Sequence, residues 1–221
     1  MKATLLALSY NEIDGVKAIM PKIDHELLHE IIVVDGGSTD GTIEWLNANG
    51  YKVVVQTQPG LGSAYREGLK VATGDIIITF SPDGNSLPDR IPALIEKMTE
   101  GPDVVTVSRY LGDAKSEDDD FVTAIGNWLF TKAYNILFGQ SVTDYLVMYR
   151  AFKTTLVKEL DINHNAISWQ SQLMCRAARA GKDIQEIEGD EPARIGGKRK
   201  MSPIRNGLAE LLMLVKELIR R

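Results

Sequence analysis

Polar side chains cluster directly after three short apolar segments of the chain. The clusters are Ser9-Tyr10-Asn11-Glu12, Asp35-Gly36-Gly37-Ser38-Thr39-Asp40-Gly41-Thr42 and Ser81-Pro82-Asp83-Gly84-Asn85. In an open α/β sheet, ligands bind outside the carboxyl ends of the strands. If the apolar segments are strands of one sheet, these carboxylates, amides and glycines meet at one edge, where they can hold a phosphorylated, hydroxyl-rich ligand.

The third cluster predicts a metal site. Asp83 and Asn85 offer side-chain oxygens, which Mg²⁺ and Mn²⁺ prefer as ligands, and diphosphate oxygens and water would complete the coordination shell. The alternative is a plain Asp-Gly turn, since this dipeptide is common in turns. The residues alone leave both interpretations open.

Two glycine-containing stretches of the chain can be explained either by ligand binding or by local backbone structure. The pair at 36–37 allows close approach of a ligand to the backbone, or simply a tight turn, and one of residues 38–40 can cap a helix that begins near Thr42. Residues 59–65, Pro-Gly-Leu-Gly-Ser-Ala-Tyr, nearly match a dinucleotide-binding fingerprint. However, Tyr65 replaces its third glycine and the stretch does not follow the first strand, so a dehydrogenase is disfavoured.

The elements that must position these clusters alternate along the chain. Apolar runs predict strands at residues 4–9, 31–35, 53–57, 76–81 and 104–108, with helical stretches between them. This alternation indicates an α/β fold, with a mostly parallel central sheet flanked by helices. Ser86, with Asp89 three positions on, predicts the start of a helix whose apolar face includes Ile91, Leu94 and Met98.

Two further helices are predicted beyond residue 110. An aromatic-rich helix covers about 122–138, after an acidic loop at 117–120. The chain ends in an amphipathic helix with one apolar stripe, formed by Leu208, Leu211, Leu212, Val215, Leu218 and Ile219.

The composition excludes several classes of protein. The chain has 221 residues, with 25 Lys+Arg against 30 Asp+Glu and 44% hydrophobic residues, which are ordinary values for one globular domain. Its mild net acidity argues against a nucleic-acid partner. The single cysteine, Cys175, has no internal partner, and the three histidines lack zinc-site spacing, so a reducing compartment fits. The first apolar run is too short for a signal peptide, and no stretch is long enough to span a bilayer.

Taken in order, the motifs resemble those of family 2 glycosyltransferases of the GT-A fold, and among these the polyprenyl-phosphate (dolichyl-phosphate) sugar synthases. Besides the three clusters, the resemblance rests on Gly60-Leu61-Gly62-Ser63-Ala64-Tyr65, Ala72-Thr73-Gly74-Asp75, Val107-Ser108-Arg109-Tyr110, Val142-Thr143-Asp144, Tyr149-Arg150, Arg176-Ala177-Ala178, and Arg194 followed by Lys200. It implies a single GT-A domain. In this domain, residues 1–110 form the nucleotide-sugar-binding half, 111–203 the acceptor half and 204–221 the amphipathic C-terminal helix.

The resemblance also implies roles for individual residues. The donor, a GDP- or UDP-sugar, would be held by Ser9, Tyr10, Asn11, Glu12, Asp35, Gly37, Ser38, Gly62 and Asp83. Mg²⁺ or Mn²⁺ on the donor diphosphate would be bound by Asp83 and Asn85. The acceptor phosphate would be bound by Arg109, Arg194 and Lys200, and the catalytic residues would be Asp83, Arg109 and Gln172. A cation aimed at the leaving diphosphate lowers the barrier, because negative charge builds up there as the glycosidic bond breaks.

Four positions depart from the family's usual pattern. Ser81 replaces the first aspartate of an Asp-x-Asp triplet, which leaves one certain anionic metal ligand, and Gly36 replaces a second aspartate after Asp35. Val147 stands where relatives often have arginine, and Gln172 where they often have glutamate. A sugar hydroxyl needs a base to take its proton, whereas a phosphate acceptor is already anionic. Gln172 is therefore compatible with a lipid phosphate as acceptor.

The sequence thus predicts an inverting transfer of a sugar from a nucleotide-sugar to a polyprenyl (dolichyl or undecaprenyl) phosphate. Two alternatives stay open. One is a saccharide or glycolipid hydroxyl as acceptor, with the acidic loop supplying the base, and the other is a non-catalytic nucleotide-sugar-binding partner subunit. A lipid acceptor implies a membrane surface as partner. We therefore expect a cytoplasmic protein, peripheral on the cytoplasmic membrane face through residues 128–138 and the C-terminal helix, and leave open a homo-oligomer or a membrane-protein partner.

Overall fold

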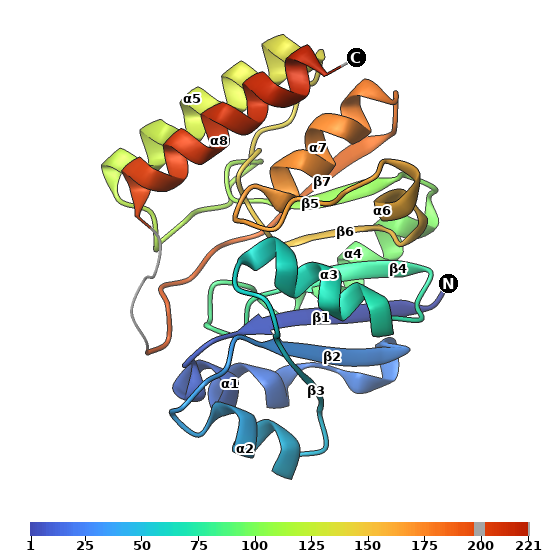
Figure 1. Ribbon diagram of the computed structural model, residues 1–221, viewed down its shortest axis with the longest axis vertical. Helices are drawn as coiled ribbons and strands as arrows, with labels where there is room; N and C mark the ends of the chain where they lie inside the picture. The colour runs from blue at the N-terminus through green and yellow to red at the C-terminus, as the bar shows by residue number, and fades with distance from the viewer. Residues whose placement is uncertain (197–201, 221) are drawn as a thin grey trace.

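A seven-stranded sheet in the order β3-β2-β1-β4-β6-β5-β7 forms the centre of the molecule (Figure 1). The computed structural model describes residues 1–196 and 202–220. The strands are β1 (Ala3–Ser9), β2 (Glu30–Asp35), β3 (Lys52–Val55), β4 (Ile76–Phe80), β5 (Val104–Ser108), β6 (Arg150–Lys153) and β7 (Ile184–Glu188). Only β6 runs antiparallel to its neighbours, β4 and β5, among the described strands. The expected mostly parallel sheet is confirmed.

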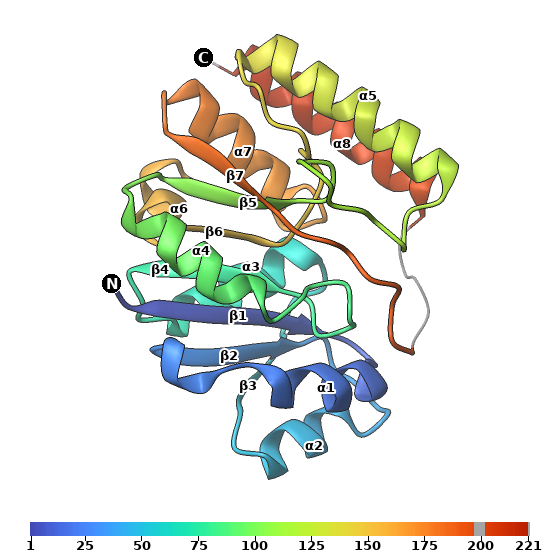
Figure 2. The same ribbon diagram turned by 180° about the vertical axis from the view of Figure 1, so that it is seen from behind.

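Helices cover both faces of the sheet, which explains why β4 and β5 are buried along their whole length. One face carries α1 (Ile13–Ile19), the short 3₁₀ helices η1 (Met20–Lys22) and η2 (His25–Leu27), α2 (Thr42–Ala48) and α4 (Arg90–Thr99). The other face carries α3 (Leu61–Val71), α6 (Thr155–Glu159) and α7 (Trp169–Arg179) (Figures 1 and 2). Successive residues of β4 face opposite sides of the sheet. Ile76 and Ile78 pack on the face that carries α1, α2 and α4, and Ile77 packs on the face that carries α3, α6 and α7.

Two long helices, α5 (Phe121–Phe138) and α8 (Pro203–Ile219), lie side by side beyond α7 at one end of the molecule (Figures 1 and 2). The helices expected at 122–138 and at the C-terminus are thereby confirmed. Both leave large apolar side chains exposed: Phe121, Val122, Ile125, Trp128, Leu129, Ile136 and Leu137 on α5, and Ile204, Leu208, Leu211, Leu212, Val215, Leu218 and Ile219 on α8. Within residues 1–196 and 202–220, no helix has the length and apolarity needed to cross a membrane.

Local hydrogen bonds confirm one expected helix start and correct another. α2 begins at Thr42, as predicted, but its N-cap is Gly41, which offers no side chain; Asp40, one residue earlier, accepts from the Thr42 N–H at 3.1 Å. The helix expected from Ser86 instead begins at Arg90. The Ser86 hydroxyl accepts from the Ser81 N–H at 3.2 Å, so it closes the turn after β4 rather than capping α4.

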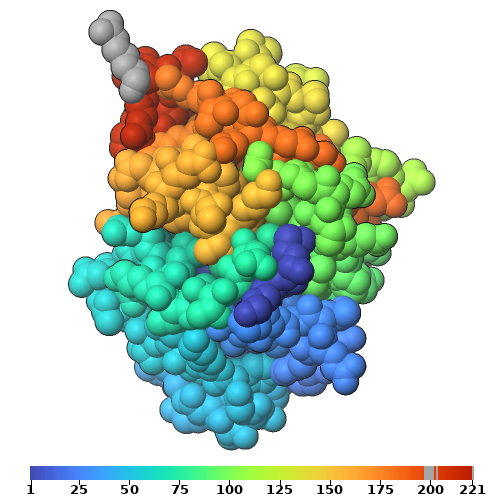
Figure 3. Space-filling view, turned by 90° about the vertical axis from the view of Figure 1, so that its right-hand side faces the viewer, coloured from blue at the N-terminus to red at the C-terminus, as the bar shows by residue number. Residues whose placement is uncertain are grey.

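The pairing register brings the predicted polar clusters together. Ser9 at the end of β1 is opposite Asp35 at the end of β2, and Ala7 is opposite Phe80 at the end of β4. Because β6 is antiparallel to both β4 and β5, these two strands point the same way, and β5 ends at the same edge. The opposite edge, where β1 begins (dark blue in Figure 3), faces away from these loops.

Candidate active site

A cleft of about 440 Å³ opens at the edge where β1, β4 and β5 end. Its walls come from the loops after these strands, the segment 146–149 before β6 and the segment 189–194 after β7. The charged side chains among the described lining residues are Glu12, Asp83, Asp118, Asp119, Asp190 and Glu191, with Arg109 and Arg194. This lining carries more negative than positive charge, which favours binding of a divalent cation together with an anionic ligand.

Asp35 organises the turn after β2, which contributes no residue to the described lining of the cleft. It is fully buried, and its Oδ1 accepts from the N–H groups of Gly37 at 2.9 Å and Ser38 at 2.7 Å. Its Oδ2 accepts from the hydroxyls of Ser9 and Ser38, both at 2.7 Å. The structure thus gathers these four expected donor-binding residues in one place, where Asp35 shapes the turn through its hydrogen bonds.

Tyr10 and Asn11 form the outer part of the same corner. Tyr10 is 47% exposed, and a Cβ at Gly36 would approach its ring to 3.1 Å, which explains why glycine fits after Asp35. Asn11 has a φ of 50°, and its side-chain oxygen accepts from the Thr39 N–H at 2.8 Å. An exposed aromatic ring above a turn rich in N–H groups can stack on a base and contact its ribose.

Asp83 and Glu12 are joined by the guanidinium of Arg194. Its Nη2 lies 2.7 Å from Asp83 Oδ2 and its Nη1 lies 3.2 Å from Glu12 Oε1. Backbone bonds hold the Arg194 segment in place, because Ile195 N–H donates to the Asp83 carbonyl at 2.7 Å. Arg194 is therefore the positive charge beside Asp83. The sequence predicted that Arg194 binds phosphate, but it did not predict this contact with Asp83.

The residues around Asp83 fit Mg²⁺ or Mn²⁺ only if the ligand supplies part of the coordination shell. Asp83 provides one carboxylate, and Asn85 donates its amide NH₂ to the Pro192 carbonyl at 2.8 Å, so only its amide oxygen can be a ligand. No group of three or more His, Cys, Asp or Glu suited to a metal occurs within the described parts of the chain. A single carboxylate with diphosphate oxygens and water matches the usual coordination of Mg²⁺. The Arg194 guanidinium must leave Asp83 Oδ2 for that carboxylate oxygen to bind the ion.

This competition between Arg194 and a cation predicts the effect of replacing Arg194 by alanine. The variant leaves Asp83 and Glu12 without their shared counter-charge, so we expect about tenfold tighter binding of Mn²⁺ to the nucleotide-free protein, or roughly 1.4 kcal/mol. Isothermal titration calorimetry measures this change. The double variant Arg194→Ala/Asp83→Asn is the control and should lose the gain, whereas equal affinities of wild type and Arg194→Ala would contradict the competition.

Arg109 is held by three carboxylates. Its Nε and Nη2 donate to the two oxygens of Asp144 at 2.6 and 3.0 Å, and its Nη1 lies 3.0 Å from Glu191 and 3.4 Å from Asp119. Burial alone would lower the pKa of Arg109, but the three carboxylates raise it well above its usual value, so the guanidinium stays charged. Arg109, which we expected to bind the acceptor phosphate, thus lines the cleft with its N–H donors already bound to carboxylates. In the structure it mainly holds this wall of the cleft together.

Gln172 is not brought to the cleft. It is fully buried in α7, and its Oε1 accepts from the N–H groups of Asn163 and His164, both at 2.9 Å. Its Nε2 donates to Glu217 of α8 at 3.2 Å. The expectation that this residue takes part in the chemistry is corrected here, because its amide joins α7, α8 and a loop.

One further expected donor residue lies in the first turn of α3. Gly62 opens α3, and a Cβ there would lie 2.2 Å from the His164 carbonyl oxygen, so glycine is required for packing against that backbone. The expected phosphate-binding residue Lys200 lies outside the described residues.

The sequence did not indicate that Arg109 is bound by a set of acidic residues. It also did not indicate that Thr123 and Asn127 of α5 line the cleft. The only sequence signal for Thr123 and Asn127 was their spacing of four residues, which places two polar side chains on the same face of a helix.

Three comparisons with known proteins bear on the family and the fold of this chain. A family model described as Glycosyl transferase family 2 matches residues 8–161. The undecaprenyl-phosphate mannosyltransferase of Micrococcus luteus is 26% identical over 215 residues, covering 91% of this chain and 88% of that protein. The dolichol-phosphate mannosyltransferase of Pyrococcus furiosus is 33% identical over 129 residues, covering 55% and 37% respectively. The crystal structure of glucosyl-3-phosphoglycerate synthase from Mycobacterium tuberculosis with Mg²⁺ and UDP has a TM-score of 0.78 at 22% identity, covering 98% of this chain and 79% of that one, a likeness of fold.

Proposed function

The chain belongs to glycosyl transferase family 2, and from this premise we propose that it transfers a hexose or related sugar, with inversion, from a GDP- or UDP-sugar to a polyprenyl phosphate. The expected GT-A fold is confirmed by the sheet and its helices and by the likeness to a solved structure. The observation that carries the proposal is Asp83 with Arg194 at the carboxyl end of β4, in a cleft that Glu12, after β1, also lines. The printed names of the relatives from M. luteus and P. furiosus support the choice of acceptor.

The proposed reaction is a single displacement. An oxygen of the acceptor phosphate attacks the anomeric carbon, and the bond from that carbon to the donor diphosphate breaks, so the diphosphate leaves with the electron pair. Arg194, which lies 2.7 Å from Asp83, offers its guanidinium to the charge that develops on the leaving diphosphate, and Asp83 would hold a divalent cation beside it. When bound, Mg²⁺ or Mn²⁺ supplies further neutralisation of this leaving group. The attacking phosphate is anionic near neutral pH, so this chain needs no base for it.

The exposed apolar side chains of α5 and α8 support attachment to a membrane surface. Trp128 is 59% exposed and Ile136 81% exposed on α5, and Ile204 is 87% exposed on α8. Aromatic and aliphatic side chains on paired surface helices can enter the headgroup region of a bilayer. We therefore propose peripheral attachment on the cytoplasmic face, where a polyprenyl phosphate and a nucleotide-sugar can meet. Failure of the protein to co-sediment with anionic vesicles that contain polyprenyl phosphate would argue against it.

An acceptor assay tests the proposed function. The full chain is incubated with radiolabelled GDP- and UDP-hexoses, Mn²⁺, and undecaprenyl or dolichyl phosphate in detergent micelles. We expect one nucleotide-sugar to yield a labelled product that partitions into organic solvent, and no such product when the lipid phosphate is left out. Tight donor binding in a thermal-shift assay without transfer to any acceptor would instead identify a non-catalytic nucleotide-sugar-binding subunit.

A sugar or glycolipid hydroxyl is the second candidate acceptor, and the acidic lining of the cleft favours it. Asp118, Asp119 and Glu191 line the same space, and burial raises the pKa of Glu191 although Arg109 opposes this. A carboxyl group with a raised pKa is a suitable base for a hydroxyl. Transfer to a neutral glycolipid, with no transfer to a polyprenyl phosphate in the same assay, would select this alternative.

A further inference from the structure

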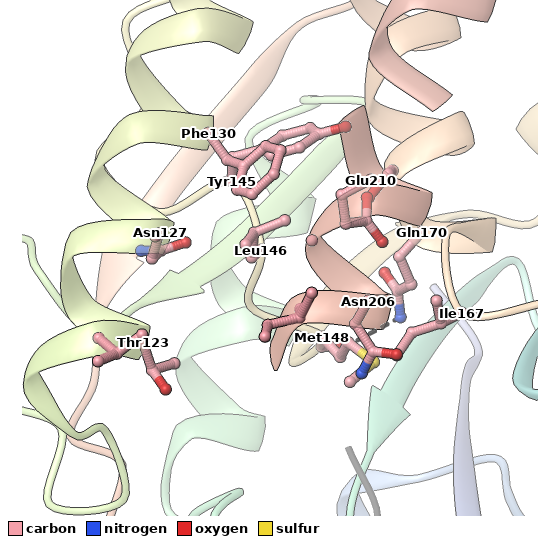
Figure 4. A pocket seen from close by; sticks show the side chains of 15 residues that line it. Thr123, Asn127, Phe130, Tyr145, Leu146, Met148, Ile167, Gln170, Asn206 and Glu210 are labelled. Carbon is pink, nitrogen blue, oxygen red and sulfur yellow. Dashed lines mark hydrogen bonds between the residues drawn. The ribbon is translucent and has the colours of Figure 1, made fainter. Parts of the chain in front are cut away.

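An apolar pocket of about 240 Å³ lies between α5 and α8, next to the polar cleft (Figure 4). Thr123, Asn127 and Phe130 of α5 form one side in Figure 4, and Asn206 and Glu210 of α8 form the other. Six residues line both the pocket and the cleft, namely Thr123, Asn127, Leu146, Met148, Ile167 and Asn206. The two spaces therefore meet, and a ligand can extend from the polar cleft into an apolar environment.

Two glycines inside the helices keep this pocket open. Gly126 of α5 and Gly207 of α8 both line it, and neither has a positive φ. Glycine is among the least favourable residues in a helix interior, and a helical φ does not require it. A Cβ at Gly126 would meet nothing within 4 Å, and one at Gly207 would meet only the Phe130 ring, at 3.8 Å. Their effect on the structure is to leave room between α5 and α8.

Polar atoms without partners mark the junction of the pocket and the cleft. Asn127 is 2% exposed, and neither its Oδ1 nor the Thr123 Oγ1 has a hydrogen-bond partner among the described residues. The two side chains are one turn apart on α5, so they present a hydroxyl and an amide to the same place. Both groups can donate to a phosphate oxygen, the amide by turning its NH₂ towards it. The donors of Arg109, by contrast, are already engaged by carboxylates.

The inner end of the pocket suits an uncharged occupant. Burial raises the pKa of Glu210, which favours its neutral carboxyl form, although the neighbouring hydroxyls of Ser171 and Ser168 oppose the shift. Gln170 donates its NH₂ to the Tyr65 hydroxyl at 2.9 Å and to the Met148 carbonyl at 3.0 Å, which fixes its orientation. The remaining wall is made mostly of aliphatic and aromatic side chains. An apolar chain fits this end better than an ion or a sugar.

We propose that the α5–α8 pocket binds the first isoprene units of the acceptor, in the space left by Gly126 and Gly207, while Thr123 and Asn127 hold its phosphate at the junction. This inference rests on the proposed function and adds the acceptor's binding site to it. The chain would enter from the exposed apolar side of α5 and α8, so the lipid reaches the cleft without leaving an apolar environment.

Filling the pocket from Gly126 tests the proposal. With an active wild type established first, Gly126→Leu should raise KM at least tenfold for undecaprenyl phosphate and for citronellyl phosphate, which has only two isoprene units. The melting temperature should not fall, because leucine is a better helix residue and fills apolar space. Binding of the nucleotide-sugar should not change. Lys70→Leu, which places the same side chain at an exposed position of α3, away from the pocket and the cleft, is the control and should leave KM unchanged.

The possible outcomes distinguish failure of the proposed lipid pocket from failure of the proposed polyprenyl-phosphate transferase function. Unchanged KM values in Gly126→Leu, with an active wild type, would overturn the pocket and leave the polyprenyl-phosphate function standing. An inactive wild type with every polyprenyl phosphate would overturn both. If Gly126→Leu does not fold, Gly207→Ala provides the same test with only a methyl group. Thr123→Val, which keeps the side-chain shape but removes the hydroxyl, should lower kcat/KM for either lipid about tenfold, and a wild-type value would refute the phosphate position.

Discussion

Asp83→Asn is expected to lower kcat by about 10²–10³-fold, the range seen when one electrostatic contact to a developing negative charge is removed. The variant keeps the shape of the side chain but loses the charge that faces Arg194 at 2.7 Å and that would bind a cation on the donor. Steady-state assays with saturating donor and lipid acceptor measure the effect. The loss should appear in kcat rather than only in KM, because the charge matters most as the diphosphate leaves.

Asp89→Asn is the matched control for this prediction. Asp89 is another aspartate of the segment between β4 and α4, but its side chain is 64% exposed and contacts only the neighbouring Arg90 among the described ion pairs. It should retain wild-type activity. Both variants should unfold cooperatively, since neither change opens the core. An Asp83→Asn protein with wild-type kcat would remove Asp83 from the donor site.

Asp144→Ala is expected to reduce the free energy of unfolding by about 3 kcal/mol, the lower end of the range for breaking a buried ion pair. Asp144 is fully buried and accepts from the Arg109 N–H at 3.2 Å, from two guanidinium nitrogens and from the Val147 N–H at 3.2 Å. Without it, the Arg109 charge stays in a buried site with only Glu191 and Asp119 as partners. Urea unfolding followed by circular dichroism measures the change.

An exposed ion pair provides the control for Asp144. Glu100 lies 2.6 Å from Lys97, and its side chain is 55% exposed, so Glu100→Ala should cost less than about 1 kcal/mol. A similar small loss in Asp144→Ala would mean that Arg109 is adequately held by its other two partners. The wall of the cleft would then not depend on the Asp144 contact.

The donor side of the cleft could be predicted from the sequence because its residues directly follow strands. A parallel sheet places the ends of β1, β2 and β4 at one edge whatever their side chains do, so Tyr10, Asp35 and Asp83 had to lie near one another. The hydrogen-bond partners of Asp35, however, could not be predicted from the order of the strands. Its bonds to the N–H groups of residues 37 and 38 are local turn contacts, which a carboxylate after a strand forms as readily as it binds a ligand.

The acceptor side depended on contacts between distant residues. The acid partners of Arg109 lie 10, 35 and 82 positions away, so no local pattern showed that its charge is already neutralised. Residues 169–178 of α7 are all buried, so apolar periodicity could not show which glutamine reaches a cavity. Gln170 lines the α5–α8 pocket, whereas Gln172, two residues on and turned towards α8, does not.

The position of β6 between β4 and β5 constrains the order in which the protein can fold. β5 has no pairing with β4, and its partners β6 and β7 begin at residues 150 and 184. A nascent chain that has reached residue 110 therefore carries a strand that is fully buried in the folded protein but still lacks both of its partners, although β1 to β4 can already pair. Unpaired apolar strands are prone to aggregation during synthesis. The sheet is completed only after β6 and β7 have been synthesised, so a chaperone that shields β5 until β6 emerges would raise the yield of folded protein.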